Sequence, residues 1–286
     1  MTKLDSFHLG ELYRELRVAR GLKMKDVVSD KLSQAQLSKF ENGQTMLSAD
    51  KLLTAISAIH MSFAEFEHAY YQYEDSSFFK QAKLISKYHS NKNIEGLEKL
   101  LIIHDNNSET YDVYDKLNKL VIRCAIHDLN PEYIISDDDK DFITTYLYSI
   151  EEWTEYELYI FGNTLQVLSD SDLIFLSKSF IERDSLYLSI PNNNFRTQLV
   201  VLNIIFVLLE RKKDYCVHYF MKHLESILTY QDMFVKTTFI FLKKVLNYRE
   251  GKGTNLIDLK KYIHDVEELG HEDVAEFLKN NIVNLL

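Results

Sequence analysis

Small polar side chains gather on one side of the segment between Ser33 and Gly43. At the 100° per residue of an α-helix, the large apolar side chains of Leu37 and Phe40 point to the opposite side. The polar side carries Ala35, Ser38, Lys39 and Asn42, with Gln34 at its start. Amide, hydroxyl and ammonium groups on so narrow a surface can reach base edges in a DNA major groove. The segment therefore predicts a DNA-reading helix.

Each side chain on the outer side of this helix suits a particular contact with DNA. The amide of Gln34 can bind adenine through two hydrogen bonds, Lys39 can donate to guanine, and the methyl group of Ala35 can contact thymine. We add Ser38 to this base-reading set and expect Gln36, which lies to the side, to contact the DNA backbone. The same side chains would also suit the solvated surface of a helical bundle that binds protein, so this alternative stays open.

Two arginines on the preceding helical segment are candidates for phosphate contacts. Apolar residues recur there at helical spacing, at Leu9, Leu12, Leu16 and Ala19. Arg14 and Arg17 lie on a separate flank of that segment. Because a guanidinium group can bind a phosphate through two parallel hydrogen bonds, both arginines are predicted to clamp the DNA backbone.

The elements that must position these residues are five short helices between residues 7 and 73. The expected N-caps of the third, fourth and fifth helices are Ser33, Ser48 and Ser62. Asn42-Gly43 tolerates the left-handed conformation that ends a helix. Met24, Val27 and Val28 mark the second helix, which a tight turn is expected to join to the third. This order is typical of a helix-turn-helix domain, which we place at residues 1–73.

The composition of the 286-residue chain favours helices throughout. Apolar residues make up 46% of it, enough for a sizeable core, while proline occurs twice and glycine eight times. No apolar run reaches membrane-spanning length, and the N-terminus lacks the apolar core of a signal peptide. Two widely separated cysteines, Cys124 and Cys216, fit a reducing compartment. We therefore expect an all-α, two-domain, cytoplasmic protein.

The net charge of −10 would repel DNA if it were spread evenly along the chain. Residues 1–45 hold eight lysines and arginines against six aspartates and glutamates, whereas the remaining residues hold 25 against 37. Attraction to phosphate is therefore confined to the first domain. Because its basic excess is small, we expect weak binding by a monomer and hence binding of double-stranded DNA by a homodimer.

Helical patterns follow one another from residue 76 to residue 286. The predicted helices are 76–89, 91–104, 108–128, 137–151, 154–168, 171–187, 192–212, 214–229, 231–250, 255–268 and 271–285. Ser136 and Thr154 each precede acidic residues that suit a positive helix end, and Pro191 suits a first turn. Helices of this number and spacing make five or six pairs, which favours a right-handed superhelix of the tetratricopeptide type.

Residues 16–22 (LRVARGL) and 37–43 (LSKFENG) resemble the helix-turn-helix of phage repressors and Xre-type regulators. Patterns similar to the Rgg/GadR/MutR branch of Gram-positive transcriptional regulators are residues 10–17 (GELYRELR), 36–41 (QLSKFE), 46–48 (MLS) and 153–158 (WTEYEL). Met24 stands where phage repressors usually have glutamine, and the following turn lacks its usual glycine and is one residue short. These departures put one phosphate contact in doubt and alter the docking angle.

This resemblance implies a DNA-binding domain followed by a repeat domain, here residues 76–286, that dimerises and binds a short hydrophobic signalling peptide in quorum sensing. Related peptide receptors hold the backbone of the ligand with asparagine amides, which makes Asn203 and Asn163 candidates. Arg123 and Arg196 could hold a ligand carboxylate. Asn203 lies in an apolar run, where a buried amide needs a partner, and a neighbouring helix could equally supply it.

No pattern in the sequence predicts catalysis, a metal site or a cofactor. His271 and Glu272 lack the second histidine of a zinc-protease helix, and glycines are too sparse for a phosphate-binding loop. We therefore predict a peptide-controlled transcriptional regulator that is not an enzyme. The alternative is a protein-interaction module, antitoxin-like or a scaffold, in which the helix-turn-helix is secondary.

Overall fold

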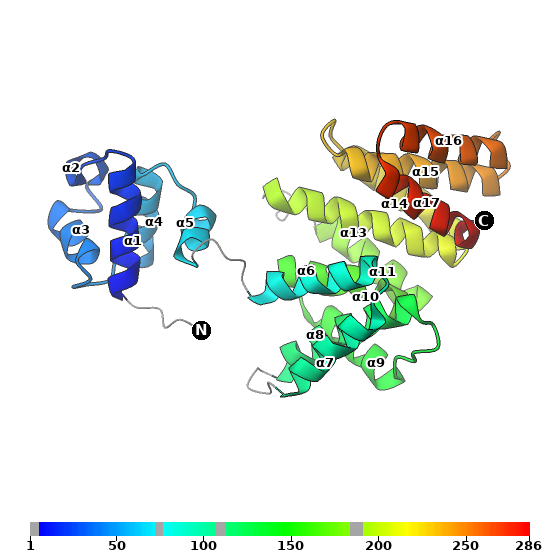
Figure 1. Ribbon diagram of the computed structural model, residues 1–286, viewed down its shortest axis with the longest axis horizontal. Helices are drawn as coiled ribbons and strands as arrows, with labels where there is room; N and C mark the ends of the chain where they lie inside the picture. Colours follow the sequence, from blue (N-terminus) through cyan, green and yellow to red (C-terminus); the bar gives the residue numbers. More distant parts are fainter. Residues whose placement is uncertain (1–5, 72–76, 107–111, 184–190) are drawn as a thin grey trace. The chain divides into compact units, whose positions relative to one another are not determined.

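The computed structural model describes residues 6–71, 77–106, 112–183 and 191–286 (Figure 1). Within these ranges the regular elements are helices, which confirms the predicted all-α class. The chain divides into two compact units, Met1–Ser86 and Lys87–Leu286. No helix in the described part of the chain is both long enough and apolar enough to cross a bilayer.

Five helices make up the described part of the first unit up to residue 71. They are α1 (Ser6–Ala19), α2 (Met24–Val27), α3 (Gln34–Glu41), α4 (Ala49–Ala58) and α5 (Phe63–Tyr70). Helix α1 packs against α3 and α5. In Figure 1 it runs between α3 on one side and α4 and α5 on the other. Ser33 and Ser62 accept hydrogen bonds from the third residue of their helices, as predicted from their positions, and thereby fix where α3 and α5 begin.

The core of this unit brings α1 directly against the end of α3. The ring of Tyr13 is fully buried beside Phe40, and its hydroxyl donates to the backbone oxygen of Ala55 at 3.0 Å. Burial raises the pKa of Tyr13 to about 12. A β-carbon added at Gly10 would lie 1.8 Å from the backbone oxygen of Phe40, so only glycine allows this close approach.

The connection between α2 and α3 is longer than predicted. Helix α2 is a single turn that ends at Val27, because Val28 already has an extended backbone. Ser29 and Leu32 then exchange two backbone hydrogen bonds of 3.0 Å before α3 begins. Leu32 is fully buried, so this small hairpin-like turn is anchored in the core. The expected tight turn is therefore a folded loop.

Helix α6 (Ser77–Ser90) spans the division between the units, and the remaining helices belong to the second. They are α7 (Ile94–Asn106), α8 (Asp112–Leu129), α9 (Asp137–Ser149), α10 (Glu155–Thr164), η1 (Leu165–Val167), α11 (Asp170–Arg183), α13 (Pro191–Glu210), α14 (Asp214–Ile227), α15 (Met233–Arg249), α16 (Leu256–Glu268) and α17 (Glu272–Leu285). Each helix predicted after residue 75 has a counterpart. Predicted positions 76, 108–111 and 184–187 lie outside the described residues.

The second unit is a helical repeat. Helices α8, α10, α13, α15 and α17 pack each against the next, and α7, α14 and α16 pack against members of this series. The long helix α13 crosses the middle of the unit (Figure 1). Thr154 caps α10 together with Glu157, and Ser136 caps the acidic first turn of α9. These local signals place the helices whose side chains form the candidate sites below.

Candidate functional site

Helix α3 is defined at both ends by its own residues. Ser33 and Gln36 cap the start reciprocally: the backbone N–H of Gln36 donates to the Ser33 hydroxyl, and that of Ser33 donates to Oε1 of Gln36. At the other end, the backbone N–H groups of Gly43 and Gln44 bond the oxygens of Phe40 and Lys39. The helix therefore presents a fixed surface.

That surface carries the predicted base-reading residues. Gln34, Ala35 and Lys39 are exposed and Ser38 is partly exposed, whereas Leu37 and Phe40 are fully buried behind them. Arg14 is also exposed, on α1. Gln36 is half-buried, and because its side-chain oxygen caps the helix, only its NH₂ group is left to contact a DNA backbone.

The prediction that Arg17 contacts phosphate needs correction. Its side chain is buried, and both Nε and Nη2 donate to the carboxylate of Glu41 at 2.7 Å. Nη1 donates to the backbone oxygen of Leu22 at 2.6 Å. The hydrogen bond to Glu41 raises the pKa of Arg17. Arg17 therefore ties α1 to the end of α3, and its guanidinium is buried inside the unit instead of lying on the surface, where it could meet a phosphate.

In the second unit, helix α13 is buried on nearly every side. One stripe stays open: Arg196, Leu199 and Phe206 are partly exposed and Asn203 is exposed, each three or four residues from the next. Asn203 was expected to be buried because its neighbours are apolar, but those neighbours face adjacent helices and Asn203 does not. Among the described residues its amide has no hydrogen-bond partner.

Helix α10 runs parallel to α13 and presents a matching stripe. At one end Glu155, the first residue of α10, forms an ion pair with Arg196. At the other end Nε2 of Gln166 donates to Glu210, the last residue of α13, at 2.9 Å. Between them, a β-carbon on Gly162 would lie only 3.1 Å from Cγ2 of Val200. We call the surface formed by Arg196, Leu199, Asn203 and Phe206 of α13, together with the neighbouring residues of α10 from Glu155 to Asn163, the α10/α13 surface.

Three of the four predicted peptide-binding residues lie on the α10/α13 surface. Asn163 is exposed and donates its NH₂ group to the backbone oxygen of Tyr159 at 2.7 Å, so its own oxygen remains available. Asn203 and Arg196 share the stripe on α13. Arg123 lies on α8, and its Nη1 is bound at 2.8 Å to Asp139 in the first turn of α9. It therefore links two helices, and its contact with a ligand carboxylate stays a prediction.

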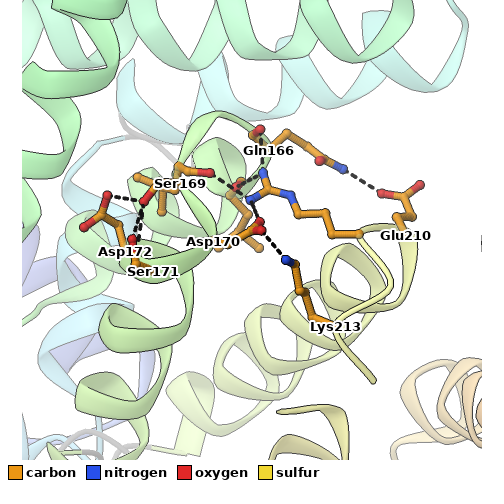
Figure 2. Close-up of polar contacts among 10 residues, drawn as sticks. Gln166, Ser169, Asp170, Ser171, Asp172, Glu210 and Lys213 are labelled. Atoms are coloured by element: carbon orange, nitrogen blue, oxygen red, sulfur yellow. Dashed lines mark hydrogen bonds and ion pairs between the residues drawn. The ribbon is translucent and has the colours of Figure 1, made fainter. Parts of the chain in front are cut away.

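Sequence reasoning missed the residues that close the far end of this surface. Arg211 directs its guanidinium into the turn after α10, donating to the backbone oxygens of Leu165, Gln166 and Leu168 and to the carboxylate of Asp170. Lys213 also pairs with Asp170 at 2.6 Å (Figure 2). The sequence did hold a signal for Glu210, which also lies at this end: Arg196, Asn203 and Glu210 recur every seven residues, so they share one face of the helix.

Residues of the same turn also line a cleft of about 520 Å³. Residues on its wall include His127, Lys140, Gln166, Ser169 and Asp172. Several of these side chains already bond within the protein: His127 contacts the backbone oxygen of Tyr133, and Asp172 accepts from Ser169. The cleft mixes charges of both signs and does not specify a ligand.

Several solved structures have the same fold. The Streptococcus dysgalactiae SHP pheromone receptor Rgg2 superposes with a TM-score of 0.80 at 20% identity, over 97% of this chain and 100% of that one. A putative transcriptional regulator from Listeria monocytogenes EGD-e gives 0.80 at 20% identity, over 98% and 97%. The PrgX/cCF10 complex gives 0.68 at 16% identity, over 98% and 92%.

The sequence itself matches a family model. Residues 99–280 match the C-terminal domain of the HTH-type transcriptional regulator Rgg, a family of regulators and not of enzymes. This match covers more than half of the chain, and the fold agrees with it over nearly the whole length. The protein therefore belongs to the Rgg family of transcriptional regulators.

Proposed function

We propose that this Rgg-family regulator binds promoter DNA as a homodimer in the cytoplasm and is controlled by a short hydrophobic peptide. Residues 1–73 serve as the DNA-binding domain and residues 76–286 as the dimerising, peptide-sensing domain. The observation that carries the proposal is the exposed polar side of α3, held by a buried ion pair, in a chain whose second unit has an open amide-bearing surface.

The DNA-binding part of the proposal rests on Gln34, Ala35, Ser38 and Lys39 as base-reading residues, with Arg14 on phosphate and the NH₂ group of Gln36 on the DNA backbone. The exposure of Gln34, Ala35 and Lys39 on one capped helix supports it. A bidentate contact to a base contributes about 1–3 kcal/mol of discrimination, while a phosphate contact contributes equally on every sequence.

Two substitutions should separate these roles. After selection of bound duplexes from a random pool, Gln34→Ala is expected to weaken binding of the selected duplex roughly tenfold and leave random duplex unaffected. Arg14→Ala should weaken both and lower the slope of log affinity against log salt by about one. Fluorescence anisotropy of the full-length protein measures both, with Lys260→Ala on the exposed side of α16 as the control. Retention of no duplex at all would favour the protein-interaction alternative.

The peptide-sensing part rests on the α10/α13 surface. Asn203 offers an amide without a partner among the described residues, and an amide can both donate to and accept from the backbone of an extended chain. Leu199 and Phe206 beside it supply apolar contacts for hydrophobic side chains. The PrgX structure with cCF10 has the same fold, which supports peptide as the class of ligand to test first.

Removing one amide from this surface should weaken peptide binding. A synthetic pool of hydrophobic peptides of five to ten residues is incubated with full-length protein, and retained peptides are counted by native mass spectrometry. Asn203→Ala is expected to reduce retention by about tenfold, because two backbone hydrogen bonds are lost. Asn280→Ala, on the exposed side of α17, is the control and should bind normally. Equal retention by Asn203→Ala would remove Asn203 from the site.

Control of transcription would then follow from a shift between conformations of the repeat. A peptide that prefers one conformation of the repeat domain changes the separation at which the two DNA-binding domains of a dimer are held. The effect on DNA affinity cannot exceed the preference of the peptide for that conformation.

A further inference from the structure

The folded loop between α2 and α3 has a fixed backbone. Ser29 and Leu32 exchange two backbone hydrogen bonds, and the hydroxyl of Ser29 also accepts from the backbone N–H of Lys31 at 3.3 Å. Leu32 is fully buried in the core of the first unit. Neither Asp30 nor Lys31, the two residues at the tip, has a positive φ, so the turn tolerates other side chains at both positions. The loop therefore holds its tip in one place, and either tip residue can be replaced without a change of fold.

Lys31 carries an exposed ammonium group on this tip. Among the described residues no carboxylate pairs with it, and the neighbouring Asp30 is exposed without pairing to it. Met24, at the start of the helix before the loop, packs against the core and has no side-chain donor for a phosphate. On this side of α3, Lys31 is therefore a cation that is held by its backbone and not used within the protein.

The chain keeps Lys31 close to the residues proposed to read bases. Successive Cα atoms are about 3.8 Å apart, so the Cα atom of Lys31 lies at most about 11 Å from that of Gln34. The major groove is about 12 Å wide and 8.5 Å deep, so the phosphates of its rim lie about 10 Å from the middle of its floor. When Gln34 and Ala35, the first residues of α3, reach base edges at the floor, the long side chain of Lys31 can reach the rim.

Building on the DNA-binding role proposed for α3, we infer that Lys31 binds a backbone phosphate at the rim of the groove that α3 reads. Such a contact carries no sequence information, but it fixes where the protein lies along the duplex. Because the backbone of the loop is fixed, the bound phosphate sets the register in which Gln34 and Ala35 meet their bases. Lys31 is thus a positioning residue for base reading.

Uncharged phosphate substitutes test this contact directly. In the selected duplex each phosphate in turn is replaced by a methylphosphonate, and binding of the full-length protein is measured by fluorescence anisotropy. One replacement in each half-site is expected to weaken binding by the unaltered protein about threefold to tenfold and to leave Lys31→Ala no weaker than before. It should lie within about three base pairs, or about 10 Å along the axis, of the base at which Gln34→Ala no longer discriminates.

Matched variants assign the effect to Lys31. Lys31→Ala should lower the slope of log affinity against log salt by about one and weaken selected and random duplexes equally, whereas Lys31→Arg should keep the slope. Lys25→Ala, which removes an exposed lysine on α2 outside the loop, should stay sensitive to the same methylphosphonate. If Lys31→Ala and the unaltered protein respond alike at every position, Lys31 binds no phosphate while DNA binding stands. If the unaltered protein retains no duplex from the random pool, the DNA-binding function fails and this contact fails with it.

Discussion

Replacing Glu41 with alanine is expected to lower the free energy of unfolding of the first unit by about 3–5 kcal/mol and to abolish DNA binding. The substitution leaves the Arg17 guanidinium buried without its carboxylate, although the bond to the backbone oxygen of Leu22 remains. Urea unfolding of the full-length protein, monitored through hydrogen exchange at the amides of α1 and α3, measures the loss of unfolding free energy in this unit alone.

A double substitution distinguishes the missing charge from a general packing defect. Arg17→Met combined with Glu41→Leu removes both charges and keeps most of the side-chain volume, so it should recover much of the stability lost in Glu41→Ala. Arg14→Ala, which alters an exposed arginine on the same helix, should change stability by less than about 0.5 kcal/mol. A cost below about 1 kcal/mol for Glu41→Ala would mean that the pair is not buried in solution.

Arg211→Ala is expected to have the second largest effect: it should lower the free energy of unfolding of the second unit by about 2–4 kcal/mol. Its guanidinium donates to the backbone oxygens of Leu165, Gln166 and Leu168, which lie at and just after the end of α10, where intrahelical donors run out. Hydrogen bonds from a charged donor are each worth about 1.5–3 kcal/mol, and their contributions overlap. Thermal unfolding of the full-length protein reports the loss.

The shape of the guanidinium, as well as its charge, should matter at this position. Arg211→Lys keeps the charge but cannot form the fork of parallel hydrogen bonds, so it should recover less than half of the lost stability. Lys222→Ala removes an exposed charge on α14 and serves as the control. Equal stability of Arg211→Lys and the unaltered protein would show that charge alone is sufficient.

Most helix positions could be predicted because their signals are local. Ser33, Ser62 and Thr154 each cap a helix through residues two or three positions away, and periodic apolar residues mark the faces that pack. The predicted helix 154–168 ends earlier, at Thr164, and continues as η1. The donors to this turn come from Arg211, far along the chain, and no local pattern reveals that contact.

The candidate sites show the same limit. The exposure of Gln34, Ala35 and Lys39 was predictable because helical periodicity alone determines which side of α3 they occupy. Arg17 was not, because its role depends on Glu41, 24 positions away. Asn203 was misjudged since an apolar neighbourhood in sequence says which residues are buried around it but not which direction lacks a neighbouring helix.

The burial of α13 has a consequence for experiments on the whole protein. This helix packs against α10, α11, α14, α15 and α17, so its backbone amides can exchange with solvent only when the entire unit opens. Their exchange rates therefore report the free energy of global unfolding of this unit. Any small molecule or peptide that binds the native form slows them in proportion to its affinity and concentration, without a label and without knowledge of where it binds.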